Sequence, residues 1–135
     1  MADIQHQIGI HATAKEIYDL IATKKGIQKW LTAAEGWNIT GEENVGGTLT
    51  FHYGGNFHEM KILKLDSNKE VNWECPAGHP EWIGTTVDFT IENKGTDNVL
   101  HFTQAGWAKK TEFFEMCSQV WAGCVATIKK LAEAV

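Results

Sequence analysis

The sequence lacks any long hydrophobic run, which excludes a membrane-spanning helix. No stretch approaches the roughly 18 consecutive apolar residues that cross a bilayer. Residues 1–6 also lack a basic segment followed by an apolar one, so no secretory signal peptide is visible. We therefore expect a cytoplasmic protein without a transmembrane segment.

Basic residues are few as well. Lys and Arg together number 12, the formal net charge is −5, and the cations form no stripe. Nucleic-acid binding depends on clustered cations that contact phosphates, so we expect no nucleic-acid partner. The chain is 43% hydrophobic and 21% charged, as in folded proteins. Its length predicts a single domain over residues 1–135.

Cysteine is scarce and irregularly spaced. Cys75, Cys117 and Cys124 are odd in number and follow no Cys-x-x-Cys pattern. The last two fall on one predicted helix, about 10 Å apart along its axis, which is too far for a disulfide. We expect free thiols that pack as small hydrophobic groups in a reducing compartment, and no cofactor.

A pair of histidines, His52 and His58, flanks Gly54-Gly55 and suggests a metal site. A two-residue turn would pair Phe51 with His58 and place the two imidazoles on opposite faces of the hairpin. A three-residue loop would pair the two histidines instead. We predict the two-residue turn, and with no carboxylate or cysteine nearby we expect no metal site.

The spacing of apolar residues predicts an α+β fold. Residues 4–10 alternate as in a strand, and Thr13 with Glu16 forms a capping box that starts a short helix. Residues 24–26, Lys-Lys-Gly, are expected to end that helix, and a second short helix carries Trp30. From about residue 35 to residue 107, alternating runs separated by glycines predict six further strands.

The last segment, residues 111–134, predicts a long helix that covers the sheet. Its apolar face is predicted to comprise Phe113, Cys117, Val120, Trp121, Cys124, Ile128 and Leu131. The order β-α-α-β6-α is that of a helix-grip fold, in which a curved antiparallel sheet of about seven strands wraps around the C-terminal helix.

Three stretches of the chain resemble one family. They are residues 8–30, residues 84–107 with Gly84-Thr-Thr-Val87 and Gly106-Trp107, and the end of the chain with Trp121 and Leu131. They are similar to bacterial proteins related to the activator of the ninety-kilodalton heat-shock ATPase. That family belongs to the superfamily of the birch-pollen allergen, START domains and polyketide cyclases, whose members commonly hold a hydrophobic ligand between sheet and helix.

This resemblance implies a cavity between the sheet and the last helix. Inward-facing strand positions, the helix and one loop supply the candidate ligand-binding residues, which are Phe51, Tyr53, His58, Met60, Trp73, Cys75, Trp82, Phe89, Phe102, Gln104, Phe113, Cys117 and Trp121. A lone buried His or Gln is more often a core residue with a satisfied hydrogen bond. The stiff loop Pro76–Trp82, which contains both prolines, is interpreted either as a plain rigid turn or as a lip over the cavity, with Trp82 and Trp107 beside its opening.

Three functions follow as alternatives. The first is a carrier for a small hydrophobic molecule such as a lipid, an aromatic compound or a polyketide. The second is an interaction module whose partner is a chaperone, and the third is a cyclase-like enzyme, for which His58 and Cys117 form the one inward nucleophile–base pair. We favour the carrier, acting as a monomer or weak dimer without a catalytic residue.

Overall fold

The computed structural model describes residues 2–31 and 37–134, which form seven strands and three helices. The elements are β1 (Ala2–His11), α1 (Ala14–Ala22), α2 (Lys24–Leu31), β2 (Trp37–Gly41), β3 (Thr48–Tyr53), β4 (Asn56–Asp66), β5 (Glu70–Ala77), β6 (Thr86–Glu92), β7 (Asp97–Trp107) and α3 (Glu112–Glu133). Residues 35 and 36, where the strand region was expected to begin, lie outside the described residues.

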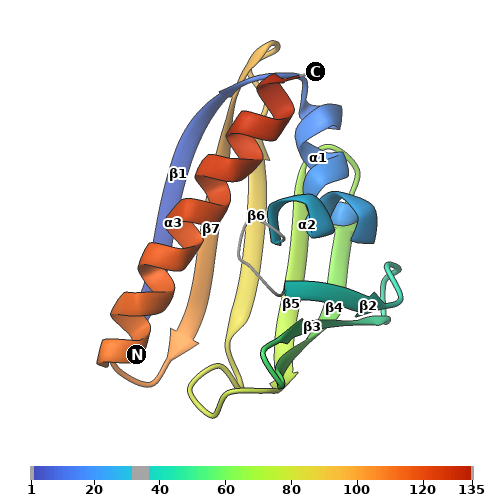
Figure 1. Ribbon diagram of the computed structural model, residues 1–135. Coiled ribbons are helices and arrows are strands. Elements are labelled where there is room, and N and C mark those ends of the chain that lie inside the picture. The colour runs from blue at the N-terminus through green and yellow to red at the C-terminus, as the bar shows by residue number, and fades with distance from the viewer. Residues whose placement is uncertain (1, 32–36, 135) are drawn as a thin grey trace.

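The strands form one antiparallel sheet in the order β1-β7-β6-β5-β4-β3-β2. The sheet is curved, and all three helices lie on one of its faces (Figure 1). Helix α3 lies over β1 and β7, α1 contacts β5 and β6, and α2 contacts β2. Two register shifts in the β4–β5 pairing mark bulges, which increase local twist and bend. The helix-grip prediction is confirmed.

The β3–β4 hairpin has the predicted two-residue turn. Gly54 and Gly55 have φ values of 51° and 83°, as a type I′ turn requires at both central positions. Phe51 therefore pairs with His58. His58 faces the core and is 2% exposed, whereas His52 pairs through its Nε2 with the Thr40 hydroxyl at 2.9 Å.

The boundary between α1 and α2 corrects one expectation. Thr13 caps α1 as predicted, but α1 ends at Ala22, and residues 24–26 begin α2 instead of ending α1. Gly26 has no positive φ. An added Cβ there would lie 2.1 Å from the carbonyl oxygen of Asp19, so glycine is needed for close helix packing.

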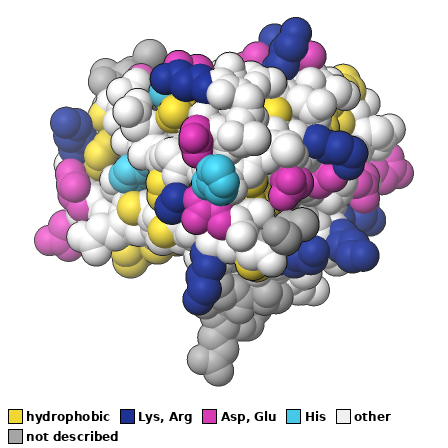
Figure 2. Space-filling model, turned by 90° about the horizontal axis from the view of Figure 1, so that it is seen from above, with side chains coloured by type: hydrophobic (Ala, Val, Ile, Leu, Met, Phe, Trp, Pro, Cys, Tyr) yellow, Lys and Arg dark blue, Asp and Glu magenta, His cyan; other side chains and the backbone are white. Residues whose placement is uncertain are grey.

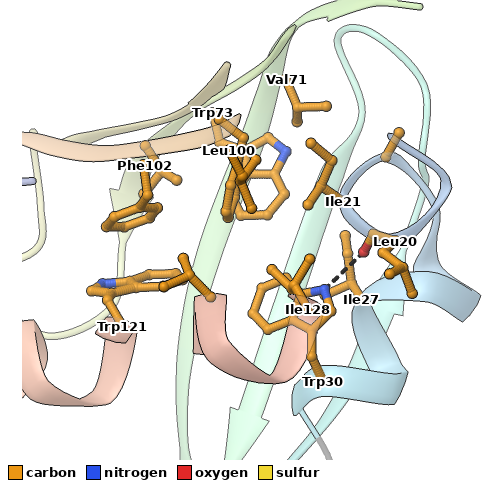
Figure 3. Packing of buried hydrophobic residues seen from close by; sticks show 14 of the residues in the cluster. Leu20, Ile21, Ile27, Trp30, Val71, Trp73, Leu100, Phe102, Trp121 and Ile128 are labelled. Atoms are coloured by element: carbon orange, nitrogen blue, oxygen red, sulfur yellow. Dashed lines mark hydrogen bonds between the residues drawn. The ribbon is translucent and has the colours of Figure 1, made fainter. Parts of the chain in front are cut away.

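The long helix α3 is rotated relative to its predicted apolar face. Its buried residues are Phe114, Cys117, Trp121, Val125, Ile128 and Ala132. Val120 is 47% exposed, and Phe113, Cys124 and Leu131 are only partly buried. Figure 3 shows Trp121 and Ile128 of α3 facing the sheet residues Phe102 and Trp73.

Trp30 of α2 joins the same core. Its indole Nε1 donates to the carbonyl of Leu20 at 2.7 Å, drawn as a dashed line in Figure 3. This bond satisfies the one polar group of a nearly inaccessible side chain. The first helix, the second helix and the sheet are thus joined around one ring.

The surface is mixed in charge. On the face viewed in Figure 2, acidic and basic side chains are interspersed. Within residues 2–31 and 37–134, no helix is long and apolar enough to cross a bilayer.

Candidate functional site

A cavity of about 120 Å³ lies between α2, α3 and the strands β2 to β4. Its lining carries no charged side chain and consists mainly of aromatic, aliphatic and sulfur-containing groups. The lining residues are Trp30, Leu31, Trp37, Phe51, Tyr53, His58, Trp82, Phe113, Met116, Cys117, Val120, Trp121 and Cys124. The arrangement offers apolar contact on most sides of a small molecule.

The predicted site residues fall into two groups. Seven of them line the cavity: Phe51, Tyr53, His58, Trp82, Phe113, Cys117 and Trp121. The others lie outside its lining, buried in the packed core: Met60, Trp73, Cys75, Phe89, Phe102 and Gln104. Sheet parity correctly directs the second group inward, but it does not distinguish a residue beside a void from one covered by a neighbour.

Gln104 shows how a core residue is satisfied. Its Oε1 accepts from the Trp121 indole at 2.8 Å, and its amide donates to the Thr85 hydroxyl at 3.1 Å. That hydroxyl donates in turn to the Trp82 carbonyl at 2.7 Å. This buried chain joins α3, β7 and the loop of residues 78–85, which we call the lip loop, and it gives both polar atoms of the Gln104 amide a partner within the protein.

Six lining residues were not predicted: Trp30, Leu31, Trp37, Met116, Val120 and Cys124. On α3 the missed signal is a second apolar stripe, since Phe113, Met116, Val120 and Cys124 follow one another at helical spacing beside the buried stripe. Trp37 stacks on Tyr53, with ring centroids 4.4 Å apart. That contact depends on the β2–β3 pairing.

His58 is one of the strongly perturbed ionisable groups of the cavity. Its ring lies flat against Trp82, with centroids 3.7 Å apart, and its Nε2 is 2.7 Å from the Tyr53 hydroxyl. Burial, with a smaller effect of nearby His79, lowers its pKa to about 4. The imidazole is therefore neutral at physiological pH, and its buried Nδ1 has no hydrogen-bond partner.

Trp82 occupies the centre of the lip loop. Its indole Nε1 donates to the Cys117 sulfur at 3.4 Å, and its ring stacks on Trp121 as well as on His58. Trp82 therefore lines the cavity. The loop itself begins later than predicted, because Pro76 still belongs to β5.

Trp107 does not border the opening. It is 1% exposed and packs against Phe113 and Phe114 of α3. The positive φ of 90° at Gly106 changes the strand parity just before Trp107. The ring consequently turns into the core at the end of β7.

The thiols are poorly suited to nucleophilic attack. Burial raises the pKa of Cys117, and it raises that of Cys124 to about 12 and that of Cys75 to about 11. His58 and Cys117 bind Tyr53 and Trp82 respectively, and a weakly basic imidazole beside a protonated thiol is not an activated pair. Among the described residues, no three His, Cys, Asp or Glu side chains gather as metal ligands.

Solved structures share this architecture. A dimeric Aha1 from Colwellia psychrerythraea is 33% identical, with a TM-score of 0.87 over 98% of this chain and 97% of that one. Protein MLL2253 from Mesorhizobium loti is 16% identical with a TM-score of 0.81, covering 96% of both chains. The major latex-like protein 151 of Panax ginseng is 16% identical with a TM-score of 0.71, covering 97% of both chains.

The two more distant likenesses show the fold alone. No curated protein matches the chain significantly. Residues 11–133, however, match the family described as Activator of Hsp90 ATPase homolog 1-like protein, and the relative from Colwellia is similar over nearly its whole length. This chain belongs to the Activator of Hsp90 ATPase homolog 1-like family.

Proposed function

We propose that this protein binds a small, uncharged hydrophobic molecule, one aromatic ring in size, in the cavity between α2, α3 and β2–β4. The observation that carries the proposal is an uncharged, largely aromatic lining around about 120 Å³. A single water needs only about 10–15 Å³ on this measure, and an engineered apolar cavity of about 150 Å³ in another protein binds benzene.

The volume narrows the ligand class. Pockets for drug-sized molecules measure roughly 300–1,000 Å³, so a whole lipid or polyketide exceeds this cavity. A ring or a short acyl chain fits it. Indole and phenyl faces from Trp82, Trp121 and Phe51 favour an aromatic ring, because offset stacking adds to the contribution of apolar burial.

A chaperone-binding role would be favoured by a broad exposed apolar surface. The exposed large hydrophobic side chains of the described residues are spread over several segments: Val45, Phe57, Leu63, Ile83, Met116 and Val120. Met116 and Val120 are exposed and also line the cavity, so we assign them to the edge of its opening. The distribution of exposed hydrophobic side chains therefore supports ligand binding more than chaperone binding.

The test replaces Val120 at the edge of the cavity. Val120→Trp would place a large ring over the opening without removing a core side chain, since Val120 is 47% exposed. Toluene added to the wild-type protein should shift the indole N–H resonances of Trp82 and Trp121 in NMR spectra. We expect the variant to bind toluene at least about ten-fold more weakly, a loss of about 1.4 kcal/mol.

The matched control is Gln119→Trp, one residue away on an exposed position outside the lining. It adds the same ring to the same helix and should bind toluene like the wild type. The proposal fails if toluene shifts no cavity resonance, or if Val120→Trp and Gln119→Trp bind it equally well.

A further inference from the structure

A second hollow adjoins the cavity on the side of the lip loop. It measures about 440 Å³ and lies between the β3–β4 turn, the lip loop and the start of α3. Its lining includes Asn56, Gly78 and His79, and it shares Tyr53 and Phe113 with the inner cavity. The two spaces therefore border the same pair of aromatic rings.

One part of the wall between them is rigid. Gly78 lies against His58, and a Cβ added to Gly78 would be 2.7 Å from the His58 Nδ1 and 3.0 Å from its Cα. Backbone and a buried ring thus meet without space for an added methyl group. His58 lines the inner cavity and Gly78 lines the outer hollow, so this contact lies between the two spaces.

The other part of the wall is the side chain of Phe113, which lines both spaces. Phe113 is only partly buried, in the first turn of α3, and its ring stacks on His79 with centroids 3.8 Å apart and planes 16° from parallel. The His79 Nδ1 accepts from the Glu81 backbone N–H at 3.1 Å, which orients the imidazole. The Glu81 carboxylate accepts in turn from the hydroxyl of Thr111, the cap of α3.

We propose that the Phe113–His79 stack is a gate between two chambers of one binding site. The ligand class is an aromatic ring joined by a short chain to an uncharged polar group such as a hydroxyl. This inference rests on the proposed function, because the ring occupies the inner cavity. The polar group reaches the outer hollow, where the Asn56 amide and the His79 imidazole supply hydrogen-bonding groups.

The volumes support this division. The inner cavity alone holds little more than a ring, whereas the outer hollow falls within the range of small-molecule pockets. Most inner polar groups already bind one another, as the Tyr53 hydroxyl does with His58 Nε2 and Trp82 does with Cys117. The remaining His58 Nδ1 is covered by Gly78. A hydroxyl on the ligand therefore finds more available partners in the outer hollow than beside the ring.

The test compares toluene with 5-phenylpentan-1-ol, which adds a chain and a hydroxyl to the ring. In NMR spectra both probes should shift the indole resonances of Trp82 and Trp121. Only the alcohol should also shift the amide resonances of Asn56 and Gly78. His79→Ala removes the stack that holds Phe113, and the association rate of the alcohol should rise about 2- to 10-fold, as expected from the energy of one aromatic pair.

Two variants control this result. His79→Phe retains a stacking ring and should return the association rate to that of the wild type. His101→Ala removes a histidine paired with Glu92 on another part of the sheet and should change nothing. Unchanged toluene affinity in His79→Ala confirms that this variant is folded with its inner cavity intact.

The outcomes separate the two proposals. If toluene binds but the alcohol shifts no outer resonance, or if His79→Ala associates at the wild-type rate, the two-chamber site is wrong and the inner cavity remains. If neither probe binds, the proposed function fails as well.

Discussion

At the residue scale, His58 combines three environments that rarely coincide. Its ring stacks on Trp82, its Nε2 binds the Tyr53 hydroxyl, and its Nδ1 is buried without a partner. An imidazole in such surroundings resists protonation, because the charged form would lose its hydration without gaining an anion. The consequence is measurable as a dependence of stability on pH.

Burial lowers the pKa of His58 from 6.5 to about 4. Between these values the unfolded chain binds a proton that the folded protein does not, so the free energy of unfolding falls as the pH falls. His58 alone should remove roughly 3 kcal/mol between pH 7 and pH 4. Urea denaturation at several pH values should show a shallower decline for His58→Phe than for the wild type.

The control for this measurement is His52→Phe. His52 lies on the opposite face of the hairpin and pairs with Thr40, so this variant removes an imidazole from the same hairpin without changing the surroundings of His58. Parallel curves for the wild type and His58→Phe would contradict the prediction. A uniform loss of stability from either substitution does not affect the comparison of slopes.

At the element scale, glycines report how closely the helices approach their neighbours. Gly26 of α2 faces the backbone of α1, where an added Cβ would lie 2.1 Å from a carbonyl oxygen. Gly123 of α3 has open space within 4 Å. Replacing glycine by a larger residue should therefore have opposite effects on stability in the two helices.

Substitution by alanine should separate these two cases. Gly26→Ala should destabilise the protein by about 2–3 kcal/mol, because α1 and α2 must move apart. Gly123→Ala should stabilise it by about 0.5–1 kcal/mol through the higher helix propensity of alanine. Thermal and urea denaturation measure both changes, and a loss of stability in Gly123→Ala would show that α3 is more tightly covered than the structure indicates.

At the scale of the whole molecule, ligand binding and stability are linked. A ligand that binds only the folded protein adds about 2.7 kcal/mol at a hundred times its Kd. For a domain of this size that gain raises Tm by roughly 5–10 °C. Calorimetry with toluene should show this increase in the wild type and a much smaller one in Val120→Trp. An equal increase in Tm in both proteins would show that toluene binds outside the cavity.

Much of the architecture follows from local patterns. Strand alternation, the Thr13 cap and the Gly54-Gly55 turn each depend on neighbouring residues, and the structure confirms all three. The predicted buried face of α3 was wrong in part, because the apolar residues of this helix span a wide arc of its surface. Only the position of the sheet decides that Phe114 is covered while Val120 is 47% exposed.

The sequence by itself determined the order of the elements, the inward residues along most of the strands and the family to which the chain belongs. Periodicity carries that information because it reflects the geometry of single helices and strands. Only the tertiary structure decided which inward residues border a void. Phe89 of β6 and Phe51 of β3 both point from their strands toward the helices. Phe89 is covered by neighbouring rings, whereas Phe51 lines the cavity. The difference arises from the curvature of the sheet and the angle of α3, which no local pattern encodes.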